Sequence, residues 1–422
     1  MTSMPSGTPP ETPATSRFRI LAAMRFREYR LFWLGGAFSN IGMWALIYGR
    51  LWLMHDLTDA PLMLGVVTMS SLGPVLLFSV WGGVIADKVN RLRLVTVSRA
   101  IFSLLALLTA TLIATDIIRP WHLIAISLGT GVLLAFDIPS RQAMLPNLVP
   151  REHLVNAIAV YSFVTAGSAI IGPGIFAPLV SFWGLEGLFF LIGVAYALTV
   201  VMLLMMKPVP RQTASDGSTL WQGLLEGLAY VRGHRMILSV LVIGVIGGIF
   251  GMSFETLLPV FADQVLSGDV YVYSWLLLAA GVGGLTGTVT LAWVGNPRNA
   301  TTIQLIAGLG LGLGLAAFSQ IGWLPVAMGV IALVGGSSVT FLTINNTIVQ
   351  NLVAEEFRGR VMSLHQLTWG VTAIGGLLMG SLAQLVDAPF ALLVGGLVTA
   401  SGTVTVSTLM LRKWRPRQNS NL

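Results

Sequence analysis

Residues 83–91 read GVIADKVNR and place three charged side chains between two long apolar segments. The apolar segments run over residues 62–85 and 92–117. Each is long enough to cross a bilayer as a helix, which takes about 20 apolar residues. A tight hairpin between two such helices needs glycine for close packing and charge to hold the turn in water. The stretch therefore predicts two helices that cross a membrane in opposite directions.

The composition extends this prediction to the whole chain. Apolar residues make up 55% of the 422 residues and charged residues only 10%, whereas a soluble domain carries about 25% charged residues. Lipid offers no hydrogen-bond partner to the backbone, so only helices and closed barrels span membranes. The apolar runs do not alternate with polar residues, which excludes barrel strands. We therefore predict an all-α, multi-pass protein of the plasma membrane or bacterial inner membrane.

Twelve spanning helices fit the apolar runs. Their expected ranges are 31–54, 62–86, 94–117, 122–145, 155–179, 186–206, 236–262, 271–294, 300–320, 323–346, 361–385 and 388–411. The loops are short except for residues 207–235, where apolar residues at helical spacing predict an amphipathic helix on the membrane surface. Residues 1–16 are rich in Pro, Thr and Ser, and we expect a disordered tail without the apolar core of a signal peptide.

The basic residues set the expected orientation, because Lys and Arg are retained on the cytoplasmic side. They occupy the two chain ends and alternate loops, and of the 24 only Arg50 and Arg119 fall elsewhere. Arg99 is expected in the same loop as Lys88, Arg91 and Arg93. Both termini are therefore expected to be cytoplasmic. The net positive charge therefore reflects the orientation of the helices in the membrane, and we expect no nucleic-acid partner.

The chain also repeats itself. Residues 147–152 read NLVPRE and residues 351–356 read NLVAEE, an offset of 351 − 147 = 204 residues, or about half the chain. Six helices is an even number, so both copies enter the membrane from the same side. The expected organisation is a tail at 1–16, a six-helix bundle at 17–206, a linker at 207–235, a second bundle at 236–411 and a tail at 412–422.

Several motifs together resemble the major facilitator superfamily over residues 20–412. The spacing G-x-x-x-D-K-x-x-R is similar to that superfamily's signature loop between its second and third helices. Four further stretches resemble the branch that contains the enterobactin exporter and the macrolide efflux proteins; they are residues 136–143, 147–152, 172–174 and 358–361. The resemblance implies two parallel six-helix repeats, with the substrate site between them near the membrane midplane.

The resemblance also implies a conformational switch. It places Asp87 against the cytoplasmic start of the eleventh helix, near residues 360–362, where a carboxylate is stabilised by about 0.3–1 kcal/mol. This contact joins the halves in one conformation and breaks in the other, so it biases a two-state equilibrium. The alternative is that the charges of residues 83–91 only mark topology. The expected switch residues are Gly83, Asp87, Lys88, Arg91, Asp137 and Arg141.

Two charges lie inside apolar helices, where a charge costs at least about 2.5–3.5 kcal/mol. Arg50 lies near the outer end of the first helix, and Glu255 lies 205 residues later at nearly the equivalent position of the seventh. We expect them to face each other across the outer part of the cavity as a gate pair, with Glu255 also a candidate proton site. The alternative is that Arg50 extends to the outer headgroups and Glu255 is a structural partner.

The fifth helix carries a glycine-rich motif that resembles the antiporter motif of exporting members. Its residues are Gly167, Gly172, Pro173 and Gly174. Glycine lets two helices approach closely, and proline loosens one helical turn. Polar or flexible side chains on helices one, ten and eleven are candidates for the substrate cavity; they are Ser39, Asn40, Met43, Ser338, Asn345 and Gln366.

These features predict a secondary active transporter that works by alternating access. We expect proton-linked export of an amphipathic small molecule, such as a drug or siderophore, by a monomer in contact with membrane lipid. The histidines do not cluster, no catalytic triad or phosphate loop occurs, and cysteine is absent, so we expect no metal, no cofactor and no enzymatic activity. The alternatives are an importer or lipid flippase of the same fold, or a scaffold that does not transport.

Overall fold

The computed structural model describes residues 22–207, 220–295 and 299–414. The predicted N-terminal tail, part of the predicted linker and most of the predicted C-terminal tail lie outside these ranges. Within them, eleven helices are long and apolar enough to span a membrane, and the shorter apolar helix α13 (Thr372–Leu385) belongs to a twelfth. The predicted all-α fold with twelve spanning helices is confirmed.

The described part of the first half contains five α-helices and three short 3-10 helices. The α-helices are α1 (Arg27–Thr58), α2 (Pro61–Lys88), α3 (Arg91–Ala114), α4 (Pro120–Met144) and α5 (Leu154–Leu204). The fifth and sixth predicted spans both lie in α5, which breaks at Gly184. Gly184 has φ 69°, in a region that glycine adopts without the steric penalty of a side chain. The break takes the place of the loop expected between these spans.

The second half begins after the linker. Its helices are α7 (Arg235–Ile246), α8 (Phe254–Gln264), α9 (Val270–Val294), α10 (Ala300–Phe318), α11 (Leu324–Leu352), α12 (Arg358–Gly370), α13 and α14 (Ala388–Trp414). Two predicted continuous helices are interrupted. A π-helical turn, Gly247–Gly251, separates α7 from α8, and Val371 separates α12 from α13.

The linker contains α6 (Leu220–Gly233), which packs against the second half. Glu226 pairs with Arg360 at 2.6 Å, and Tyr230 stacks on Phe357 with 4.3 Å between ring centroids. The sequence predicts that this amphipathic helix lies on the membrane surface. Its apolar residue Val231 is buried against the end of the second bundle, whereas Leu225 and Leu228 are exposed, so the position on the membrane surface stays a prediction.

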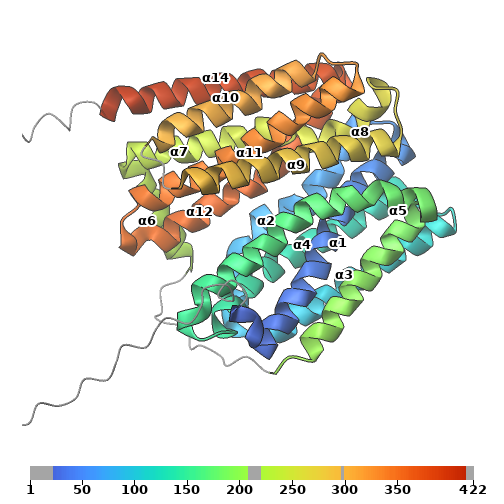
Figure 1. Cartoon of the computed structure of the whole chain (residues 1–422), viewed down its shortest axis with the longest axis horizontal. Coiled ribbons are helices and arrows are strands. Elements are labelled where there is room, and N and C mark those ends of the chain that lie inside the picture. Colours follow the sequence, from blue (N-terminus) through green and yellow to red (C-terminus); the bar gives the residue numbers. More distant parts are fainter. Residues whose placement is uncertain (1–21, 208–219, 296–298, 415–422) are drawn as a thin grey trace, which may run out of the picture.

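Two layers of helices form the bundle (Figure 1), and its two ends differ. The start of α1, the end of α14 and α6 lie at one end, which we call the terminal face. The turns that join α1 to α2 and α8 to α9 lie at the other end, the opposite face. The halves meet along two seams, where α2 packs on α13 and α5 packs on α9.

Glycine makes the seam between α2 and α13 close. A Cβ atom on Gly65 would lie 2.6 Å from the carbonyl oxygen of Gly376, and one on Gly380 would lie 2.7 Å from that of Pro61. Backbones that approach this closely leave no room for a side chain. Van der Waals packing between small residues is a main source of helix association in lipid. This seam therefore holds the two halves in register.

We expect Gly65→Ala to destabilise the protein by about 1–3 kcal/mol, because the new methyl group overlaps backbone atoms that a rotamer change cannot move. Thermal unfolding in detergent measures the effect. Gly329→Ala in α11 is the matched control, since its Cβ would meet nothing within 4 Å. A Gly65→Ala protein as stable as the Gly329→Ala protein would contradict this account of the seam.

Candidate functional site

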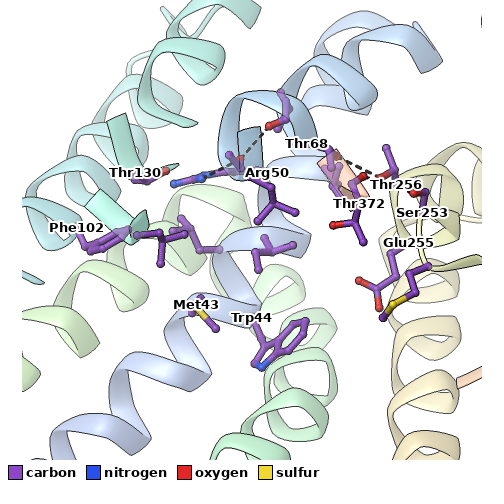
Figure 2. Close-up of a pocket in the computed structure, with 18 of the residues that line it drawn as sticks. Met43, Trp44, Arg50, Thr68, Phe102, Thr130, Ser253, Glu255, Thr256 and Thr372 are labelled. Carbon is purple, nitrogen blue, oxygen red and sulfur yellow. Dashed lines mark hydrogen bonds between the residues drawn. The ribbon is translucent and has the colours of Figure 1, made fainter. Parts of the chain in front are cut away.

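A cavity of about 120 Å³ lies between the two halves. Helices α1 to α5 form one side of it, and the segment from Met252 to Thr256 together with Thr372 of α13 forms the other. Most of its wall is apolar or aromatic, including Met43, Trp44 and Phe102. A few polar groups interrupt this wall (Figure 2). An apolar cavity with few polar groups is typical of a small-molecule site.

Arg50 supplies the positive charge of the cavity wall. The residue is 4% exposed and extends from α1 toward Thr130 of α4 (Figure 2). Its Nη1 donates to Ser71 Oγ at 3.5 Å, whereas Nε and Nη2 have no hydrogen-bond partner among the described residues. Arg50 therefore points inside the bundle in this conformation and does not extend to a headgroup region.

Glu255 lies on the wall formed by the second half. It is in the first turn of α8, directly after the π-helical turn. Such turns change the register of a helix and are frequent at functional sites. Beside it, Thr256 shares a hydrogen bond of 3.2 Å with Thr68 of α2, so a pair of hydroxyl groups joins the halves at the cavity. Thr68 also donates to the carbonyl of Leu64 at 3.0 Å.

The structure brings Arg50 and Glu255 to the same cavity but does not pair them. They lie on opposite walls (Figure 2), and among the described residues neither an ion pair nor a hydrogen bond joins them. The gate role therefore stays a prediction.

Aromatic and polar side chains join the halves beyond the cavity, toward the opposite face. His55 of α1 contacts Asp263 of α8 at 3.1 Å between Nε2 and Oδ2. Trp52 stacks on Tyr273 with 5.4 Å between ring centroids, and the Tyr273 hydroxyl donates to the Tyr48 carbonyl at 3.4 Å. We call these five residues the opposite-face latch. The latch lies between the cavity and the opposite face.

A sequence profile of the transmembrane secretion effector family, within the major facilitator superfamily, matches residues 19–421. The chain belongs to this family. It is 26% identical to the staphyloferrin A transporter of Staphylococcus aureus over 351 residues, which cover 82% of this chain and 87% of that protein. It is 23% identical to the multidrug efflux pump Tap of Mycolicibacterium fortuitum over 345 residues, covering 79% and 83%.

A solved structure of the nucleoside transporter NupG has the same fold. It superposes with a TM-score of 0.71 at 14% identity and covers 92% of this chain and 100% of that one. The resemblance to the major facilitator superfamily and its efflux branch is confirmed. The chain is therefore a multi-pass membrane transporter.

The predicted switch residues divide into two groups. Gly83, Asp87 and Lys88 lie in the last turns of α2, but the surroundings of these three residues are outside the described part of the structure. The same holds for Pro173 of the fifth-helix motif and for the cavity candidate Gln366. Arg91 begins α3, and its Nη1 donates to the Ala143 carbonyl at 3.2 Å near the end of α4.

Asp137 and Arg141 belong to a buried ionic network in the first half of the chain. Asp137 Oδ2 accepts from Arg99 Nη2 at 2.6 Å and lies 3.3 Å from Arg141 Nε. Arg141 also donates to the Tyr161 hydroxyl at 3.1 Å and to Asn40 Oδ1 at 3.5 Å. Arg99 and Asp137 are 1% and 0% exposed. The network joins α1, α3, α4 and α5.

Assigning Arg99 to the loop charges was wrong. The residue lies eight positions after Arg91, or about 12 Å along α3 at 1.5 Å per residue. Asp137 lies at a similar depth, seven positions before Met144 at the end of α4. Opposite charges at matching depth on consecutive antiparallel helices are the sequence signal that identifies this pair.

The glycines of the fifth-helix motif have different neighbours. A Cβ atom on Gly172 would lie 2.8 Å from Cβ of the cavity residue Trp44, so this glycine lets α5 approach α1. One on Gly174 would lie 3.4 Å from Leu278 of α9, across the seam between the halves. One on Gly167 would meet nothing within 4 Å. Close packing therefore accounts for Gly172 but not for Gly167.

Of the predicted cavity residues, Met43 lines the cavity. Ser39 and Asn40 donate to the Gly36 carbonyl within α1. Asn345 donates to the Val240 carbonyl and contacts His365. Ser338 is buried in α11. None of these four is in the cavity wall, because three of them bond within their own half and Ser338 faces its interior. The polar wall groups that sequence reasoning missed are the hydroxyls of Thr68, Ser71, Thr130, Tyr196, Ser253 and Thr256.

We expect Asp137→Asn to destabilise the protein by about 3–5 kcal/mol, because it leaves Arg99 and Arg141 buried without their counter-charge. Thermal unfolding in lipid nanodiscs measures the loss. Glu28→Gln is the control, since Arg27 and Glu28 form a partly exposed pair for which we expect at most about 1 kcal/mol. Equal melting temperatures for the two variants would exclude a structural role of the network.

Proposed function

We propose that the protein exports an amphipathic small molecule from the cytoplasm by alternating access, in exchange for protons. The observation that carries this proposal is a cavity shared by both halves, with side chains of both between it and the opposite face. A latch made of a few side chains can open without unfolding either bundle. Rocking of the halves would then expose the cavity to each side in turn.

The distribution of basic residues supports a cytoplasmic terminal face. Arg25, Arg91, Arg232 and Arg358 all lie at helix ends on that face, whereas Arg119 precedes α4 at the opposite face. Cytoplasmic loops retain Lys and Arg. With this orientation, the latch lies on the outer side of the cavity.

The relatives support export of small molecules. One is named for transport of staphyloferrin A and another as a multidrug efflux pump. The apolar and aromatic wall of the cavity suits a molecule with an apolar body, and its hydroxyl groups suit a polar end.

Glu255 is the proposed proton-binding group. It is the carboxylate that lines the cavity among the described residues. Protonation removes its charge, and a neutral carboxyl group costs less free energy than a carboxylate in a water-poor cavity. A carboxyl group that changes its protonation as the cavity changes sides can link transport to the proton gradient.

Cells that overproduce the protein should tolerate and secrete compounds that cells lacking it retain, and a profile of drug susceptibility and siderophore secretion identifies such a compound.

In proteoliposomes, we expect export of that compound to follow an imposed pH gradient. Glu255→Gln should remove that dependence because the amide does not titrate, while Glu255→Asp keeps part of it.

Glu152→Gln is the matched control, because the Glu152 side chain is 77% exposed and lies outside the cavity. A Glu255→Gln protein with full dependence on the pH gradient would rule out the proposed proton site. Uptake instead of export in the same vesicles would establish that the protein is an importer. The absence of flux for every compound tested would favour a scaffold that does not transport.

The chain contains no cysteine, so introduced pairs can be cross-linked selectively. We expect a short bismaleimide across His55→Cys/Asp263→Cys to stop transport, because these positions join the halves and must separate when the outer side opens. The control is Asp116→Cys/His122→Cys, two positions of the first half beside the turn between α3 and α4. Transport by the cross-linked latch variant at the rate of its untreated form would contradict alternating access through this latch.

A further inference from the structure

The guanidinium of Arg50 presents two free N–H groups on one edge. Nη1 is directed to Ser71 Oγ, and the atoms without partners are Nε and Nη2. Nε–H and Nη2–H are the two parallel donors on the side edge of an arginine. This edge matches the two oxygens of a carboxylate, which it binds through two parallel hydrogen bonds.

The groups around Arg50 leave its charge without a counterion among the described residues. Those that line the cavity with it are the hydroxyls of Ser71 on α2 and Thr130 on α4, the ring of Phe102 on α3 and the phenol of Tyr196 on α5. Glu255 on the far wall makes no ion pair with it. Arg99 and Arg141, by contrast, share Asp137. A buried unpaired charge in a membrane protein is costly and is usually functional.

A third free donor lies in the same wall. The hydroxyl of Tyr196 is buried and has no hydrogen-bond partner among the described residues, and its ring lines the cavity. Tyr196 and Arg50 line the same wall of the cavity. An anionic group bound on the side edge of Arg50 therefore has a neutral O–H donor in the same wall.

Resting on the proposed transport function, we propose that the substrates carry a carboxylate, which binds to the Nε–Nη2 edge of Arg50 with Tyr196 as a second donor. The apolar body of the substrate lies against Met43, Trp44 and Phe102. One guanidinium balances one monoanion, so the site favours a carboxylate over a phosphate dianion. The predicted substrate class is amphipathic organic carboxylates.

A matched pair of probes tests this inference: 4-phenylbutyrate and its neutral amide, 4-phenylbutyramide. Their binding to the full-length protein in lipid nanodiscs is measured by isothermal titration calorimetry. We expect the carboxylate to bind the wild-type protein about tenfold or more tightly than the amide, as charge-assisted bidentate bonds allow. Arg50→Gln should abolish this ratio, and Arg50→Lys should keep part of it, because the ammonium retains the charge but lacks the parallel donors.

Arg119→Gln is the control, because it removes the same charge from an exposed position outside the cavity and should leave the ratio unchanged. Tyr196→Phe keeps the ring and should weaken carboxylate binding about threefold or more, which provides a second readout if Arg50→Gln folds poorly. The proposal is overturned if the wild-type protein fails to bind phenylbutyrate, if it binds the amide equally well, or if Arg50→Gln retains the preference.

The outcome is independent of the test of export. Export of a compound by a protein without carboxylate preference would leave the transport function standing and remove this inference. If the protein prefers carboxylates at Arg50 but exports nothing, this inference stands and the proposed export function does not.

Discussion

A charge inside a bundle surrounded by lipid must be balanced, and this constraint explains how the first half is built. Asp137 balances Arg99 and Arg141, and the three side chains connect α3 and α4, with Arg99 and Asp137 fully buried. Arg50 lies in the same half without such a partner and faces the cavity. The bundle therefore contains two kinds of buried cation, one that holds helices together and one that is available to a ligand.

The two halves contact each other in two different ways. Along α2 and α13, glycines bring the backbones together, and such contacts are lost as a whole if the helices part. At the opposite face, individual side chains from α1, α8 and α9 meet. Both kinds of contact lie toward the opposite face, because Gly65 is in the first turns of α2 and Gly380 is in the last turns of α13. Opening of that face must therefore part the glycine seam as well as the side-chain contacts.

The spanning helices could be predicted from the sequence because lipid requires long continuous apolar runs, and the runs are unmistakable here. The depth of a single charged residue within the membrane is harder to predict from the sequence. Arg99 looks like a loop charge when only the distance to the helix end is considered, and its partner Asp137 is 38 residues away. The position of Arg50 and Glu255 in one cavity follows from the internal repeat, but their separation depends on side-chain direction and on the π-helical turn. Asn40 and Asn345 show that a polar side chain in a spanning helix can be satisfied within its own half.

The hydrogen bond between Thr68 and Thr256 crosses the cavity between the halves, yet Thr68 also has the Leu64 carbonyl within reach in its own helix. Because Thr68 donates its one O–H to the Leu64 carbonyl, Thr256 is the donor between the halves, and Thr68 keeps its own hydrogen bond when they part. Losing such a neutral bond costs about 0.5–1.5 kcal/mol, far less than parting a buried ion pair. A contact of this type therefore adds little to the free energy needed to separate the halves at the cavity.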